Sequence, residues 1–129
     1  MATDAGKAGR ARILMVDDDH GTNEAMQRLL NRMGYDVRTA DSVQSALRAC
    51  QAENFDILIS DIGLPDGTGY DLMRQLLSSG RSGMKGIALS GFAMDDDVKQ
   101  SLEAGFEQHV RKPVNFERLQ NLLEKMKPD

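Results

Sequence analysis

The 129-residue sequence has little of what stabilises very small or secreted proteins. It contains one cysteine, Cys50, so no disulfide can form within the chain, and a lone thiol suits a reducing compartment such as the cytoplasm. It has no tryptophan, three prolines and only 5% aromatic residues. The longest aliphatic run near the start, residues 13–16, is far too short for a membrane span or a signal-peptide core. We therefore expect no membrane association.

Basic residues are also scarce relative to acidic ones, and no basic cluster is present. The formal net charge is -4, which disfavours nucleic acid as a direct ligand. Hydrophobic residues make up 40% of the chain and charged residues 28%, the composition of an ordinary globular domain. Residues 1–10 are small and polar without periodicity, so we expect a disordered lead-in followed by one domain over residues 11–127.

Five short aliphatic segments alternate with longer amphipathic segments along this domain. Three of the short segments are apolar almost throughout, as is typical of strands buried on both faces of a parallel sheet. The other two are more polar, which is expected for strands at the edges of a sheet. The predicted strands are residues 12–16, 36–40, 56–60, 86–90 and 108–112, of which the second and fifth are the polar ones.

The longer segments carry apolar residues at helical spacing, and the first of them stops at Gly34. The fourth follows the aspartates at 95–97 and has only Val98 and Leu102 as clear apolar contacts, so it is expected to be the least firmly packed. Five strands alternating with five helices predict an α/β fold with a doubly wound five-stranded parallel sheet. In such sheets, ligands bind beyond the carboxyl ends of the strands.

Chemically active side chains stand at the ends of four predicted strands: Asp17 and Asp18, Asp61, Ser90, and Lys112. Each alone is commonplace, because acids and serines after strands often cap helices. Their coincidence at one edge of the sheet is unusual, because the repulsion between two carboxylates about 5 Å apart costs about 3 kcal/mol at an effective dielectric near 20. Either a shared proton or a cation must offset this repulsion, and oxygen ligands favour Mg²⁺ over zinc. A lysine, a hydroxyl and carboxylates around a divalent ion suit phosphoryl chemistry, with a carboxylate as nucleophile.

The same residues carry a resemblance to a known family. The segments ILMVDDD, DILISDIGLPDGTGYDL, IALSG and RKP occur in this order. With them, the chain resembles the receiver domain of two-component response regulators. The resemblance implies a flavodoxin-like fold with strand order 2-1-3-4-5. It also implies a phosphorylation-controlled signalling switch and not an enzyme with an external substrate.

The resemblance implies a role for each acidic residue. Asp61 matches the phosphoacceptor. Asp17 and Asp18 match the acid pair that holds Mg²⁺, with Asp18 a direct ligand and Asp17 acting largely through water. Gly63 stands where a backbone carbonyl completes the ligands of the metal.

The remaining positions are matched with one departure. Ser90 matches the switch hydroxyl that contacts a phosphoryl oxygen, and Lys112 matches the lysine that pairs with it, followed by a cis bond to Pro113. His109 stands where most receivers have a mobile aromatic switch residue. A histidine can swing in the same way, but an edge-strand histidine without this role fits the sequence equally well. Phe92 either slows the access of water or simply packs.

The implied phosphodonor is a histidine kinase or a histidine phosphotransfer domain, acting with Mg²⁺. Phosphorylation would change the face formed by the fourth helix, fifth strand and fifth helix and so address a downstream protein. The motifs look most like receivers fused to hybrid histidine kinases. Three alternatives remain: an interaction module that is never phosphorylated, a Mg²⁺-dependent aspartyl-phosphate phosphatase, and a flavodoxin-like cofactor binder. The phosphatase lacks a second acid at position 63 and a cap domain, and the cofactor binder lacks a phosphate-binding loop.

Overall fold

The computed structural model describes residues 11–80, 83–91 and 95–126, with the backbone alone for residues 95–98. The expected lead-in over residues 1–10 and the side chain of Phe92 lie outside these ranges. The main sheet has five parallel strands in the order β2-β1-β3-β6-β7, so the predicted fold class and both predicted edge strands are confirmed. These strands are β1 (Arg12–Val16), β2 (Asp36–Ala40), β3 (Ile57–Asp61), β6 (Lys85–Ser90) and β7 (Gln108–Arg111).

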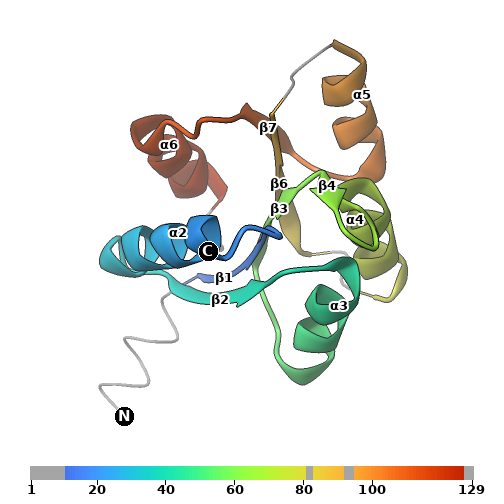
Figure 1. The fold of residues 1–129 in the computed structure, drawn as a ribbon, viewed down its shortest axis with the longest axis horizontal. Helices are drawn as coiled ribbons and strands as arrows, with labels where there is room; N and C mark the ends of the chain where they lie inside the picture. The colour runs from blue at the N-terminus through green and yellow to red at the C-terminus, as the bar shows by residue number, and fades with distance from the viewer. Residues whose placement is uncertain (1–10, 81–82, 92–94, 127–129) are drawn as a thin grey trace.

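Five helices cover the two faces of this sheet (Figure 1). Helices α2 and α6 lie on one face, and α3, α4 and α5 lie on the other. Their bounds are α2 (His20–Arg32), α3 (Val43–Ala52), α4 (Gly69–Ser78), α5 (Asp95–Ala104) and α6 (Phe116–Met126). No helix in the described part of the chain is long and apolar enough to cross a membrane.

Side chains of the inner strands pack into two hydrophobic cores, one on each face of the sheet. Ile13 and Met15 of β1 pack into the core under α2 and α6, whereas Leu14 and Val16 pack into the core under α3, α4 and α5. All four side chains are fully buried. Successive side chains of a strand point to opposite faces, so a strand covered on both faces must be apolar throughout. This requirement explains the near-continuous aliphatic runs in the sequence.

Polar side chains cap the starts of α3, α4 and α6. Ser42 accepts a hydrogen bond from the backbone N–H of Ser45 at the start of α3, and Asn115 accepts one from Arg118 at the start of α6. Thr68 accepts one from Asp71 in α4. The Lys112–Pro113 bond is cis, as the resemblance implied.

Two expectations about packing and boundaries are wrong. Leu102, expected as an apolar contact of α5, is 54% exposed, and the helix buries Ser101 and Ala104 instead. These two small side chains are three residues apart and therefore share one face of the helix. The third strand runs from Ile57 to Asp61 and not over 56–60, because Asp61 still pairs with β6. The fourth strand begins at Lys85 and the fifth ends at Arg111, each one residue from its expected bound.

Connection β3–α4 contains a short element that the sequence analysis missed. Strands β4 (Gly63–Leu64) and β5 (Gly67–Thr68) form a small antiparallel hairpin directly after Asp61. Two-residue strands are too short to leave a periodic pattern in the sequence.

Truncation of a core leucine should test the two-layer packing. Leu72 in α4 is fully buried, so Leu72→Ala should lower the free energy of unfolding by about 2–5 kcal/mol through lost contacts and a residual cavity. Urea unfolding followed by circular dichroism measures this loss. The matched control, Leu102→Ala on the exposed face of α5, should change the free energy by less than about 0.5 kcal/mol. Equal losses in both variants would contradict this packing.

Candidate functional site

The site is formed where neighbouring strands β1 and β3 end. Val16 pairs with Ser60, so the residues that follow them, Asp17 and Asp61, emerge side by side at the carboxyl edge of the sheet. Carboxylate oxygens of Asp17, Asp18 and Asp61 lie within 4.8 Å of one another. The sequence predicted this cluster from the strand ends, and the strand order brings it together.

Lys112 reaches the cluster from the connection between β7 and α6. Its Nζ lies 2.8 Å from Oδ2 of Asp17 and 3.1 Å from Oδ2 of Asp61. The Asp17 side chain is only 1% exposed, whereas that of Lys112 is 29% exposed. One ammonium thus bridges two carboxylates and offsets one of three negative charges, so the cluster keeps a surplus of negative charge.

These ion pairs also change the acidity of Lys112. Burial on its own would lower the pKa of the ammonium, but the hydrogen bonds to Asp17 and Asp61 and the attraction of their charges together outweigh burial and raise the pKa above its usual 10.5. Lys112 is therefore charged throughout the physiological range.

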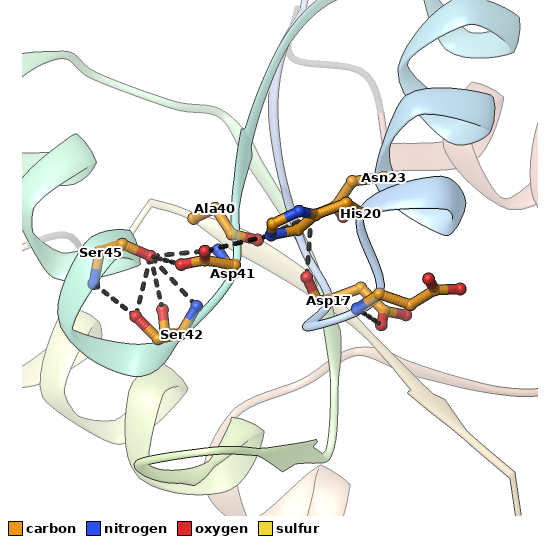
Figure 2. Close-up of polar contacts among 8 residues, drawn as sticks. Asp17, His20, Asn23, Ala40, Asp41, Ser42 and Ser45 are labelled. Carbon is orange, nitrogen blue, oxygen red and sulfur yellow. Dashed lines mark hydrogen bonds and ion pairs between the residues drawn. The ribbon is translucent and has the colours of Figure 1, made fainter.

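The backbone around Asp17 is held by a side chain that the sequence analysis missed. Asn23, buried in the first turn of α2, donates from Nδ2 to the carbonyl oxygens of Asp17 at 2.8 Å and Ala40 at 3.0 Å (Figure 2). The backbone N–H of Asp19 donates to Oδ1 of Asp17 at 2.9 Å. With Lys112 on its other oxygen, the Asp17 carboxylate is fixed from both sides. An amide on the apolar face of α2 was the available sequence indication of this role.

A cavity of about 360 Å³ lies beside this network, between the start of α2 and the β2–α3 connection. His20 lies at its edge, where its Nε2 is 3.4 Å from Oδ2 of Asp41 (Figure 2). The hydroxyl of Ser45 and then His20 lower the pKa of Asp41.

Gly69 is a second residue with an unrecognised role at the site. A Cβ at this position would lie 2.5 Å from the carbonyl oxygen of Asp61 and 3.2 Å from Oγ of Ser60. The first distance is too short for any side chain, so only glycine lets α4 begin against the end of β3. The N–H of Gly69 also donates to the carbonyl of Ile62 at 2.8 Å, which closes the connection that contains the hairpin.

The other three predicted site residues are Ser90, Gly63 and His109, and each lies in a different strand. Ser90 is buried at the end of β6, one residue past the partner of Asp61, and its carbonyl accepts from the N–H of Lys112 at 2.8 Å. Gly63 is exposed in β4, and a Cβ there would meet nothing within 4 Å. His109 lies against α5, with Nδ1 2.8 Å from Oγ of Ser101.

The donor set of the cluster suits a hard divalent cation. Its side-chain ligands are all carboxylate oxygens, and the exposed Asp18 leaves one side open to solvent. Oxygen ligands with room for water favour Mg²⁺ or a similar ion over zinc, which prefers nitrogen and sulfur.

Comparison with known proteins gives a consistent result. The model of the response regulator receiver domain family matches residues 13–124. Response regulator protein PilR of Pseudomonas aeruginosa is 33% identical over 88% of this chain, which spans 25% of that protein. Sensor protein EvgS of Escherichia coli is 29% identical over 88% of this chain, which spans 9% of that protein.

Solved structures give the same result for the fold. A receiver domain protein from Methanospirillum hungatei is 34% identical with a TM-score of 0.83, covering 91% of this chain and 94% of that one. A BeF3-activated DrrB receiver domain is 27% identical with a TM-score of 0.83, covering 91% of this chain and 97% of that one. The fold and site thus define a signalling module of the CheY-like, flavodoxin-like type. The chain belongs to the response regulator receiver domain family of two-component signalling.

Stability should depend on pH through Lys112. Its pKa is raised in the folded state, so its contribution is complete below pH 10.5 and is lost as the pH rises through the folded value. At neutral pH, Lys112→Met should lower the free energy of unfolding by about 1–3 kcal/mol, because the buried Asp17 loses its partner. Above pH 10.5, wild type should lose stability more steeply than this variant, as measured by urea unfolding. Lys99→Met, at an exposed position of α5, should keep the wild-type slope; a wild-type slope in Lys112→Met would contradict the prediction.

Proposed function

We propose that this domain is a phosphorylation-controlled switch that accepts a phosphoryl group on Asp61. The observation that carries the proposal is the position of the Asp61 carboxylate. It ends a buried strand, lies 3.1 Å from the ammonium of Lys112, and shares a cluster with Asp17 and Asp18. A carboxylate in this setting has one cationic partner, Lys112, for the incoming phosphoryl oxygens.

The proposed reaction is an in-line transfer from a phosphohistidine. An oxygen of Asp61 attacks the phosphorus, a new O–P bond forms, and the P–N bond breaks with its electron pair leaving on the imidazole of the donor. Lys112 and the hydroxyl of Ser90 contact the phosphoryl oxygens. Asp17, Asp18, Asp61 and the carbonyl of Gly63 are the residues that would hold Mg²⁺, which when bound neutralises charge on the phosphoryl group.

The ion pairs of Lys112 provide a route from phosphorylation to conformation. In this structure one ammonium holds both Asp17 and Asp61. A phosphoryl group on Asp61 would compete for that ammonium and for Ser90. Lys112 follows β7 directly, and β7 is tied to α5 by the bond between His109 and Ser101. We propose that the α5–β7–α6 face changes on phosphorylation and contacts a downstream protein.

The surface next to Lys112 offers a docking place for the phosphodonor. A mainly apolar groove of about 290 Å³ lies between α2 and the β7–α6 connection. Because Lys112 belongs both to this groove and to the site, a protein seated there would reach Asp61. We propose a histidine kinase or histidine phosphotransfer domain as this donor, in the cytoplasm. The groove residues are Thr22, Ala25, Met26, Lys112, Pro113, Val114 and Phe116.

Phosphorylation by a small phosphodonor tests the proposal directly. Acetyl phosphate with Mg²⁺ should add one phosphoryl group, visible by intact mass and removed by hydroxylamine, because the product is a mixed anhydride. Asp61→Asn should remove the label, since an amide cannot attack phosphorus, while circular dichroism stays unchanged. Asp71→Asn, an exposed acid in α4, is the matched control and should be labelled as wild type. Full labelling of Asp61→Asn would overturn the assignment.

Metal binding gives a separate test. Addition of Mg²⁺ to the unphosphorylated protein should shift the amide resonances of Asp17, Asp18 and Gly63, because carboxylates at this edge lose mutual repulsion when the ion binds. Asp18→Ala should abolish the response, because it removes a direct ligand and so costs more than the roughly tenfold seen for residues that only orient ligands. Unchanged affinity would remove Asp18 from the ligands of the metal. Asp71→Ala should respond as wild type.

A further inference from the structure

We infer that Asp66 is a positioning residue for metal binding: it anchors the β4–β5 hairpin, and with it the carbonyl of Gly63, to the N-terminus of α3. The inference rests on the proposed function, because it assigns to the hairpin the carbonyl that would complete the ligands of Mg²⁺. Asp66 is exposed, and its carboxylate bonds to the backbone of α3 and not to the acid cluster.

Both oxygens of the Asp66 carboxylate are used in this contact. Oδ1 accepts from the backbone N–H of Val43 at 2.7 Å, and Oδ2 accepts from that of Gln44 at 2.9 Å. These are the first two N–H groups of α3, which have no partner within the helix. The positive end of the helix dipole favours a carboxylate there, and charged acceptors make the stronger hydrogen bonds. The contact is therefore a firm two-point attachment between the hairpin turn and the helix.

Helix α3 does not need Asp66 to begin. Ser42 already caps it, accepting from the N–H of Ser45 at 3.0 Å, and Oγ of Ser45 accepts from the N–H of Ser42 at 3.1 Å. This capping box is a complete local start for the helix. Asp66 lies more than twenty residues further along the chain. Its contact with α3 therefore serves mainly to hold the hairpin.

The pairing within the hairpin is short, although Leu64 of β4 is buried in the core under α3, α4 and α5. Each strand has two residues, with Gly63 opposite Thr68 and Leu64 opposite Gly67. So short a hairpin is not stable alone and depends on its anchors. At its base, Gly69 donates to Ile62, and at its turn Asp66 holds α3.

Close packing around the turn supports this picture. A Cβ at Gly67 would lie 3.3 Å from Cγ2 of Val43, so the turn rests directly on the first residue of α3. Hydrogen bonds from the N–H groups of Gln44 and Val43 lower the pKa of Asp66, which keeps the carboxylate charged near neutral pH. With the turn released from α3, the hairpin strand that carries the carbonyl of Gly63 loses one of its anchors.

Three variants separate positioning from loss of charge and from loss of helix capping. Mg²⁺ is titrated into each unphosphorylated protein and followed by amide resonances of Asp17 and Asp18. Asp66→Ala should raise the Mg²⁺ concentration at half-saturation by about tenfold, the smaller end of effects seen for residues that orient metal ligands. Asp66→Asn removes the same charge but keeps one acceptor for an N–H group, so its increase should be clearly smaller. Ser42→Ala removes the other cap of α3 without touching the hairpin and should change the concentration less than twofold.

Each other outcome overturns the inference in a distinguishable way. If Asp66→Ala and Asp66→Asn raise the half-saturating Mg²⁺ concentration equally, the effect is explained by loss of charge. If Asp66→Ala and Ser42→Ala raise it equally, the effect is explained by loss of helix capping. If Asp66→Ala does not fold, the inference is overturned when Asp66→Asn has the same half-saturating Mg²⁺ concentration as the wild type. Labelling of Asp66→Ala by acetyl phosphate at saturating Mg²⁺ should still reach one phosphoryl group. The proposed function therefore stands even if this inference is wrong. If the wild type itself shows no response to Mg²⁺, both the inference and the metal requirement are wrong.

Discussion

The mutual repulsion of three carboxylates at one edge of the sheet is the constraint on which the rest of this structure depends. Asp17, Asp18 and Asp61 come together because β1 and β3 are neighbours in a parallel sheet. Lys112 offsets part of their charge through two ion pairs and is carried there by the connection after β7. The remaining negative charge is what makes the site attractive to a divalent cation.

Residues around this cluster serve mainly to hold it open and fixed. Asn23 ties the end of β1 to that of β2, and Gly69 lets α4 start against the carbonyl of Asp61. Asp66 joins the hairpin after Asp61 to α3. None of these residues belongs to the acid cluster, yet Asn23 and Gly69 contact the backbone that carries Asp17 and Asp61, and Asp66 holds the segment that follows Asp61. With the proposed function, the site would bind an ion and then a phosphoryl group, and such binding needs this support.

Much of the fold could be predicted because its patterns are local. Apolar runs such as 57–59 and helical spacing such as that of Leu119, Leu123 and Met126 are visible in the order of residues alone. Errors arose where local pattern does not decide packing. Leu102 has the spacing of a core residue but is exposed, since α5 approaches its neighbours through the small Ser101 and Ala104. The hairpin after Asp61 has strands too short for any periodicity.

The sequence by itself determined the five strands of the main sheet, their buried or polar character, and the acids, hydroxyl and lysine that follow them, because these depend on the alternation of neighbouring residues and on the resemblance they carry. Only the tertiary structure decided which groups from different elements meet: Asp66 with the start of α3, Asn23 with Ala40, and His109 with Ser101. A hydrogen bond between distant segments depends on strand order, helix placement and side-chain direction together. No pattern of adjacent residues specifies that combination.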